Sequence, residues 1–320
     1  MIKLFWSILA CAVAASASAT DAWPSRPIRI INPYAGGGAS DMVARVVGAR
    51  LSVQLNTPVV VESKPGAGNL VGTAYVVKAQ PDGYTLLLAA NPTYAAQVHL
   101  VKDLPYDIVR DLTRINSLVF TPMVLSVRPS LPITSVQEFI TYAKANPGKM
   151  AYASVGSYNT LSLSTALFRS KTGVQLLDVP YKGSSQGLTD LLAGNIQLMF
   201  DTVNVPLPHI QAGKLRALGT TGETRAPSLP NVPTMIEQGV NMTIGSFLGL
   251  MGPANMPKDV VNRLSAELIK VMADPEVRAT FAKVGMEPRT FVSADAYDAF
   301  FRKDVDVLGT LVREANIKPE

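Results

Sequence analysis

The sequence predicts an α/β protein built as two lobes. Short apolar runs rich in β-branched residues alternate with segments of helical periodicity, which is typical of βα units around a mostly parallel sheet. The chain has 320 residues, and at roughly 150 residues per domain this length suggests two domains. With 48% apolar and 17% charged residues, the chain is too apolar and too weakly charged to remain disordered.

The first nineteen residues have the layout of a secretory signal peptide. Lys3 supplies a positive charge, an apolar run follows from Leu4 to Ala15, and Ala17-Ser18-Ala19 is a cleavage motif of small residues. The apolar run is about twelve residues, too short to cross roughly 30 Å of hydrocarbon. A membrane anchor and lipidation at Cys11 remain alternatives. Cleavage near Ala19 leaves an exported chain without its only cysteine and lowers the net charge from +5 to +4.

Eight segments are predicted to be strands because each is a short apolar run rich in β-branched residues. They are Ile28–Ile31, Val59–Glu62, Thr85–Ala89, Met123–Val127, Met150–Ala153, Val174–Val179, Ile196–Phe200 and Leu215–Thr220. The following segment, Thr221–Thr234, contains three prolines and no periodicity, so we expect a connector.

Helices are predicted where apolar periodicity coincides with a start or stop signal. Ser40 is expected to cap a helix over Asp41–Gln54, and Ser135 to open a capping box with Glu138. The other signals are Asn146-Pro147-Gly148 as a helix end, Pro257 before a helix over Lys258–Met272, and Ser293 as the cap of the last helix.

Two polar loops follow predicted strands and are the candidate binding elements. Loop one, residues 32–41, brings three glycines to the start of a helix, where free N–H groups and the helix dipole favour a carboxylate or phosphate. Asp41 complicates this site, because its own carboxylate can occupy those donors. Loop two, residues 154–160, carries hydroxyls and an amide in the other half of the chain. Each loop is also compatible with a plain turn that binds nothing.

Other motifs and the composition argue against several functions. The segment Gly66–Gly72 is one residue longer than the dinucleotide fingerprint and follows Pro65. Gly183–Gly187 matches the nucleophile elbow around Ser185, but His209 is the only later histidine and follows too closely for a triad. Basic residues form no stripe, so we expect no nucleic-acid binding. We also expect no cofactor, no metal and no enzymatic activity.

A set of motifs resembles one receptor family over nearly the whole exported chain. These motifs are Pro33–Asp41, Lys64–Gly68, Pro81–Leu87, Leu104–Asp107, Val179–Gly183, Asp190–Gly194, Phe200-Asp201 and Leu229–Thr234. In this order they resemble the TctC/Bug family, the extracytoplasmic solute receptors of tripartite tricarboxylate transporters.

The resemblance implies a periplasmic Venus-flytrap protein whose two α/β lobes close over a small carboxylate and deliver it to a membrane permease. Lobe 1 would comprise residues 20–124 and 244–320, and lobe 2 residues 125–243. The resemblance also implies a monomer. A sensory role with a signalling kinase and, less favoured, a secreted serine hydrolase using Ser185 remain alternatives. The ligand-binding residues that the resemblance implies are Tyr34, Ala35, Gly36, Gly37, Gly38, Ala39, Ser40, Asp41, Thr93, Ser154, Gly156, Ser157, Thr160 and Asp201, and we add Tyr94 and Tyr158 as candidates.

The chain departs from the family pattern at two histidines and one loop glycine. Tyr94 and Ser162 stand where members often carry histidine, and Tyr158 stands where they often carry glycine. If Tyr94 and Tyr158 face the cleft, they offer stacking surface that favours an aromatic or planar carboxylate over citrate. Two surface tyrosines are the alternative.

Overall fold

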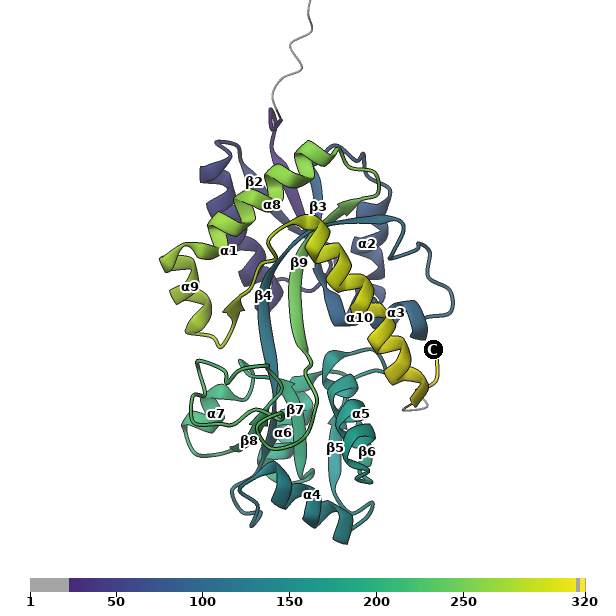
Figure 1. Ribbon diagram of the computed structural model, residues 1–320, viewed down its shortest axis with the longest axis vertical. Helices are drawn as coiled ribbons and strands as arrows, with labels where there is room; N and C mark the ends of the chain where they lie inside the picture. Colours follow the sequence, from purple (N-terminus) through teal and green to yellow (C-terminus); the bar gives the residue numbers. More distant parts are fainter. Residues whose placement is uncertain (1–22, 315–316, 320) are drawn as a thin grey trace, which may run out of the picture.

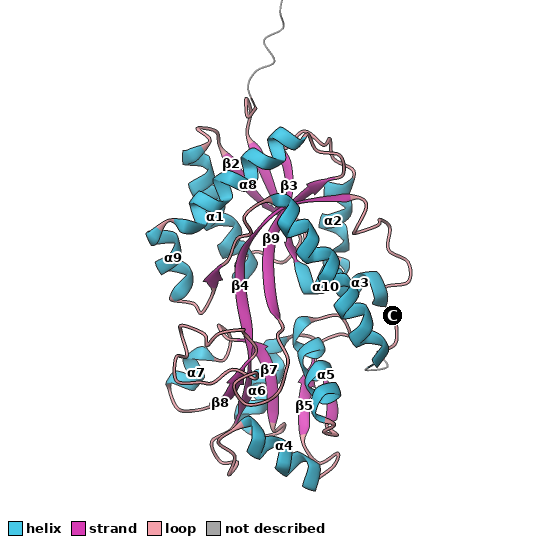
Figure 2. Cartoon of the chain, viewed as in Figure 1, coloured by secondary structure: helices cyan, strands magenta, loops and turns pink. Residues whose placement is uncertain are grey.

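Two α/β lobes lie end to end in the computed structural model and are joined by long strands (Figures 1 and 2). The structure describes residues 23–314 and 317–319. The predicted signal peptide, residues 1–19, lies outside the described residues. Within those residues, no helix is both long enough and apolar enough to cross a membrane.

Lobe 1 contains both ends of the described chain. Its sheet has the strand order β2-β1-β3-β9-β4, with β10 added to β4. Its strands are β1 (Ile28–Asn32), β2 (Val59–Ser63), β3 (Thr85–Ala90), β9 (Gly245–Pro253), β10 (Glu287–Pro288) and the first part of β4 (Leu112–Val127). Its helices are α1 (Ala39–Gln54), η1 (Ala67–Asn69), α2 (Leu70–Val77), α3 (Asn91–Leu100), α8 (Lys258–Ala273), α9 (Pro275–Ala282) and α10 (Ala294–Glu314).

The isoleucines of strand β1 are buried on both faces of the sheet, whereas Arg29 between them is partly exposed and donates to the Tyr75 and Thr85 hydroxyls. Ile28 and Ile30 pack in the cluster that contains α1 and α8, whereas Ile31 packs in the cluster on the other face. Strands β1, β2 and β3 are parallel, so their carboxyl ends lie at one edge of the sheet. Loop one and α3 follow two of these ends.

Lobe 2 is formed by the middle of the chain. Its parallel strands β7, β5 and β6 lie beside the last part of β4, and β8 also pairs with β4. These elements are α4 (Val136–Ala145), β5 (Ala151–Ser154), α5 (Thr160–Thr172), β6 (Leu177–Pro180), α6 (Ser184–Ala193), β7 (Leu198–Thr202), α7 (Leu207–Gln211) and β8 (Arg216–Thr220).

Strand β4 belongs to both sheets. Residues Leu112 to Pro122 pair with β9 in lobe 1, and Met123 to Val127 pair with β7 in lobe 2. The sequence predicted only the second part of β4, because polar residues interrupt the first part. Arg114 and Asn116 are nevertheless buried there, since Arg114 donates to Asp298 and Asn116 donates to Ser265.

The prediction of Ser40 as a helix cap is wrong. Helix α1 begins at Ala39, with Gly38 as a cap that offers no side-chain hydrogen bond. The caps at Ser135 and Ser293 are confirmed, because their hydroxyls accept the N–H groups of Glu138 and Ala296. The helix predicted over Lys258–Met272 is one residue longer.

Several strand boundaries also differ from the prediction. Strands β5, β6 and β7 lie one to three residues later than predicted, and β9 was not predicted. The glycines and prolines of β9 resemble a loop in the sequence, but its glycines allow close packing. A Cβ at Gly249 would lie 2.1 Å from the Tyr297 hydroxyl.

Candidate functional site

Loop one presents an open helix N-terminus at the edge of lobe 1. The first bond within α1 joins the Met42 N–H to the Gly38 carbonyl at 3.1 Å. The N–H groups of Ala39, Ser40 and Asp41 therefore have no acceptor within the helix. Residues Ala35 to Ala39 are exposed. This arrangement is suited to an anion, because the helix dipole adds partial positive charge to these donors.

Asp41 orders loop one from within. Its buried carboxylate accepts the Gly37 N–H at 3.1 Å and the Arg45 Nε–H at 2.8 Å. The Arg45 bond, followed by the Gly37 bond, lowers the pKa of Asp41 below its usual range. Gly37 has φ +81°, a conformation that favours glycine. Asp41 thus fixes the backbone of the loop and occupies one of its donors.

The hydroxyl of Tyr34, in loop one, and the whole side chain of Tyr94, in α3, are buried. The Tyr34 phenol lies beside the Asn69 side chain and the Ala90 backbone, and burial raises its pKa to about 12. Tyr94 is 0% exposed, and its hydroxyl lies 2.6 Å from the Thr73 hydroxyl. Burial raises the pKa of Tyr94 well above its usual value. The ring of Tyr94 is therefore a core side chain in this structure and offers no stacking surface.

Three neighbouring residues were not nominated from the sequence. Gln97 donates to the Asn69 Oδ1 atom at 3.0 Å, while Gln97 Oε1 and Asn69 Nδ2 are buried without a hydrogen-bond partner among the described residues. Tyr106 is also buried, and this raises its pKa to about 12. Buried polar atoms of this kind usually bind water or a ligand. Of these three residues, only Tyr106 belongs to a motif used for the family resemblance, Leu104–Asp107. That motif does not indicate that Tyr106 lies near loop one.

Loop two has a defined backbone at the start of α5. The Asn159 side chain caps this helix by accepting the Leu161 N–H at 3.0 Å. The Val155 N–H donates to the Ser162 hydroxyl at 2.8 Å. Ser162 thus holds the backbone of loop two through this hydrogen bond, and Thr160 is buried in the first turn of the helix.

Tyr158 connects the two lobes. A Cβ at Gly68 would lie 2.5 Å from the Tyr158 hydroxyl, so this hydroxyl lies directly against η1 of lobe 1. Asn69, the next residue of η1, lies beside Tyr34 of loop one. The structure therefore brings Tyr34 and Tyr158 to one interface through residues 68 and 69.

Other nominated residues of loop two line a separate pocket. Ser154, Gly156 and Ser157 line a pocket of about 610 Å³ between lobe 2 and the C-terminal end of α10, where Glu314 and Ile317 also line it. Loop-one residues do not line this pocket. Its charged lining groups are Arg169, Asp178 and Glu314, two carboxylates against one guanidinium, which does not suit an anion.

Thr93 and Asp201 lie at the ends of sheet elements in different lobes. Thr93 is half-buried in the first turn of α3, which directly follows β3. Asp201 lies near the end of β7 and is 7% exposed, and it accepts the Thr202 N–H at 2.8 Å. Burial raises the pKa of Asp201 to about 6, although Thr202 and Ser184 oppose this effect.

The described residues give no support for hydrolase or metal chemistry. Ser185 lies exposed on the first turn of α6, and within the described part of the chain its hydroxyl forms no hydrogen bond to a histidine. The His99 ring instead bonds the Val305 carbonyl at 2.8 Å in lobe 1. Residues 23–314 and 317–319 contain no group of three or more His, Cys, Asp or Glu placed to hold a metal ion.

Comparisons with known proteins agree with this architecture. A Cupriavidus necator protein described as "UPF0065 protein in gbd 5'region" is 38% identical over 89% of this chain and 86% of its own length. The structure "R. palustris Rpa4515 with adipate" is 30% identical, with a TM-score of 0.81 over 93% of this chain and 100% of that chain. The structure of MatC from Rhodopseudomonas palustris with bound malate is 26% identical, with a TM-score of 0.75 over 91% of this chain and 100% of that chain.

The family match covers most of the described chain. Residues 43–317 match the family described as "TctC: Tripartite tricarboxylate transporter family receptor". This match confirms the resemblance inferred from the sequence motifs. The two lobes, the crossing strands and the polar loops at the lobe interface are consistent with a receptor that binds a solute. The chain belongs to the TctC family of solute-binding receptors.

Proposed function

We propose that this protein captures a small carboxylate in the periplasm by closing its lobes and delivers it to a permease of the tripartite tricarboxylate type. The observation that carries this proposal is the meeting of loop one, η1 and Tyr158 at the lobe interface. Lobe 1 is assigned residues 20–124 and 244–320, and lobe 2 residues 125–243. The change of partner within β4 after Pro122 supports this division.

The donor set at loop one suits a carboxylate group. The free N–H groups of residues 39–41 are fixed donors, and a hydrogen bond to a charged group contributes about 1.5–3 kcal/mol. Tyr34, Tyr106 and Tyr158 add phenol groups near the interface. A micromolar complex needs about 8 kcal/mol, so a few such bonds together with buried ligand area suffice.

Closure follows from the placement of donors on both lobes. A ligand that bonds both the donors of loop one and the Tyr158 hydroxyl has higher affinity for the closed arrangement than for the open one, so it shifts the population toward closure. The similar proteins bound to adipate and malate support a dicarboxylate as the ligand.

Calorimetry with the exported chain, unfolded and refolded to remove bound solutes, tests this proposal. The panel comprises adipate, malate, citrate, glutamate and phenylacetate, and small-angle X-ray scattering measures compaction with each ligand. We expect at least one carboxylate to bind and to reduce the radius of gyration. The absence of binding by every carboxylate would contradict the proposal.

Ala39→Pro tests the helix N-terminus directly. Ala39 is the first residue of α1, and Gly38 has the extended backbone (φ −88°, ψ −176°) that a following proline favours. The substitution removes one free N–H group without removing a helix bond, so affinity for the bound carboxylate should fall about tenfold. Lys258→Pro, at the first position of α8 and exposed, is the matched control. An unchanged affinity in Ala39→Pro excludes this N–H group from the site.

A further inference from the structure

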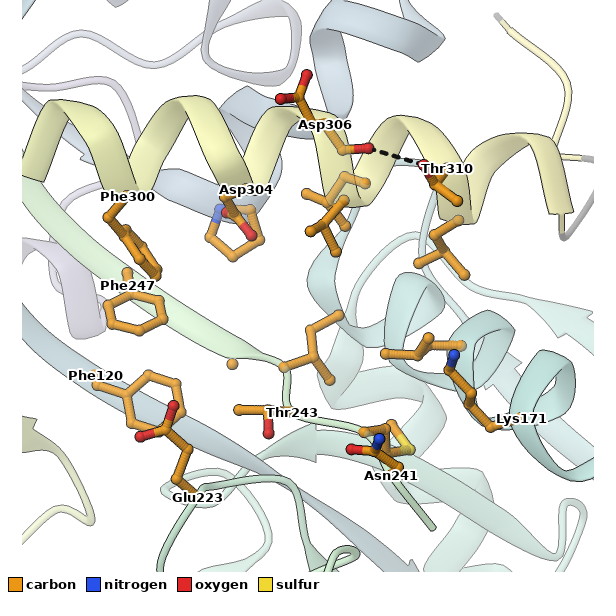
Figure 3. A pocket seen from close by; sticks show the side chains of 18 of the residues that line it. Phe120, Lys171, Glu223, Asn241, Thr243, Phe247, Phe300, Asp304, Asp306 and Thr310 are labelled. Carbon is orange, nitrogen blue, oxygen red and sulfur yellow. Dashed lines mark hydrogen bonds between the residues drawn. The ribbon is translucent and has the colours of Figure 1, made fainter.

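A second pocket lies on the crossing strands, outside loops one and two. This hinge pocket has a volume of about 590 Å³ and is lined by β4, β9, α10, α5 and the segment 241–245. Its volume lies within the range of small-molecule sites. Figure 3 shows α10 along one side of the pocket and the segment that contains Thr243 on the other.

Three phenylalanines form one wall of the hinge pocket. Phe120 of β4, Phe247 of β9 and Phe300 of α10 lie in a row in Figure 3. Ring centroids of Phe120 and Phe247 are 4.6 Å apart, and those of Phe247 and Phe300 are 4.9 Å apart. Phe120 and Phe247 are only 2% and 8% exposed, so the partly exposed ring of Phe300 is the aromatic surface that an apolar or aromatic body can reach.

Asp304 places a carboxylate beside this aromatic wall. It follows Phe300 by one helical turn, and Figure 3 shows its carboxylate below α10, on the pocket side. One of its carboxylate oxygens is buried and has no hydrogen-bond partner among the described residues. Burial also raises the pKa of Asp304 to about 6. An unpaired buried carboxylate is costly, so a donor that binds it gains free energy.

The charges of the lining favour a cation over an anion. The carboxylates of Glu223, Asp304 and Glu314 line the pocket together with two cationic side chains, Lys171 and Arg289, whereas the Asp306 carboxylate lies on the opposite side of α10. Arg289 is already engaged, because it pairs with Glu223 at 3.2 Å and lies over the Phe120 and Phe247 rings. A second carboxylate-binding site is therefore a poor fit here.

We propose that the hinge pocket binds a small organic amine. Its apolar or aromatic body would lie against Phe300 and the apolar side chains that line the pocket, and its ammonium group would donate hydrogen bonds to Asp304. Aromatic faces next to a carboxylate are the groups that recognise such a cation.

Calorimetry with 2-phenylethylamine and tryptamine, in the absence of any carboxylate ligand, tests this proposal. The anionic control is 3-phenylpropionate, which has a similar aromatic body. We expect both amines to bind and 3-phenylpropionate not to bind. Equal binding of the anion, or no binding of either amine, would overturn the proposal.

Three carboxamide variants locate the amine. Asp304→Asn should weaken amine binding at least tenfold, because it removes the charge with little change in shape. Asp306→Asn is the matched control on the same helix, since Figure 3 shows this carboxylate on the opposite side of α10. The affinity of Asp306→Asn for the amines should change less than twofold. Asp201→Asn should also retain amine binding. A loss of amine binding in this variant would place the amine at the interface between loops one and two.

A second substitution covers the case in which Asp304→Asn does not fold. Phe300→Leu keeps an apolar side chain of similar size but removes the aromatic face. We expect amine affinity to fall about threefold to fivefold, with an unchanged far-UV circular dichroism spectrum. Unchanged affinity in this folded variant would exclude the aromatic wall from the site.

Discussion

Individual buried side chains make the protein sensitive to pH, and Asp201 is the clearest case. Its pKa is raised from 3.8 to about 6 by burial. Below both values the carboxyl is protonated in the folded and the unfolded chain. As pH rises, the unfolded chain loses this proton first, so the folded protein is progressively destabilised until pH exceeds about 6.

We predict that Asp201→Asn removes this pH-dependent destabilisation. The difference between 3.8 and about 6 corresponds to about 3 kcal/mol. Relative to the wild type, the variant should gain stability between about pH 4 and about pH 7.5. Urea unfolding at both pH values measures the free energy of unfolding of each protein. Asp304 titrates in both proteins, so its contribution cancels when the free energies of the variant and the wild type are subtracted. Parallel pH profiles would show that Asp201 is not the group responsible.

Tyr94 allows a test that separates packing from ligand contact. Its hydroxyl bonds the Thr73 hydroxyl at 2.6 Å inside lobe 1. Tyr94→Phe should lower the free energy of unfolding by about 1 kcal/mol, because one buried hydrogen bond is lost. Carboxylate affinity should remain within about twofold of wild type. A large loss of carboxylate affinity with unchanged stability would indicate that Tyr94 contacts the ligand.

Among the elements, α4 shows how a short sequence signal fixes a helix start. The Ser135 hydroxyl accepts the Glu138 N–H at 3.1 Å, and the Glu138 carboxylate accepts the Thr134 N–H at 2.6 Å. Ser135→Ala should therefore destabilise the protein by about 1 kcal/mol. Thermal and urea unfolding measure this loss.

Thr141→Ala is the matched control for that prediction. This residue lies on the exposed face of α4, and its hydroxyl donates to the Gln137 carbonyl within the helix. Its removal should change stability by less than about 0.5 kcal/mol. A similar loss in both variants would mean that the Ser135 cap has no special role.

The elements that the sequence predicted well are those with local signals. Strands β1 to β3 and helix α8 have apolar patterns or helix-start residues, so their positions were recovered to within one residue. The first part of β4 was missed because its polar residues become acceptable only when α10 and α8 supply Asp298 and Ser265. Such partners are distant in the sequence and leave no local pattern.

The candidate site was predicted in part for the same reason. Loop one was recognisable from its glycines and the helix after it. Asp41 accepts the N–H group of Gly37, which precedes the helix, and not one of the helix-start donors that the sequence suggested it could occupy. The association of Asn69, Gln97 and Tyr106 depends on three separate elements of lobe 1. Nothing in the chain order indicated that Tyr158 would contact Gly68 of the other lobe.

For the whole molecule, the contact between Gly68 and Tyr158 lies where the two lobes meet. Gly68 has φ +62°, and a Cβ there would lie 2.5 Å from the Tyr158 hydroxyl. Gly68→Ala should therefore hold the lobes apart and lower carboxylate affinity by about tenfold, since the binding-competent population falls. Calorimetry with the carboxylate found in the panel measures the loss.

The double variant Gly68→Ala/Tyr158→Phe separates this clash from backbone strain. Without the hydroxyl, the nearest Tyr158 ring atom would lie 3.6 Å from the new Cβ, which is an ordinary contact. Affinity should therefore recover in part, while the cost of an alanine with positive φ remains, about 1–2 kcal/mol. If the double variant binds no better than Gly68→Ala, the contact does not control closure.

The position of β9 also determines the order in which the molecule is completed during synthesis. In the finished sheet β9 lies between β3 and β4, although both are synthesised long before it. All strands of lobe 2 are available by Thr220, whereas two edges of lobe 1 remain unpaired until residues 245–253 have emerged. Unpaired edges recruit other strands. The nascent chain therefore passes through a stage at which lobe 2 has its complete sheet while the opposite lobe still needs protection from aggregation.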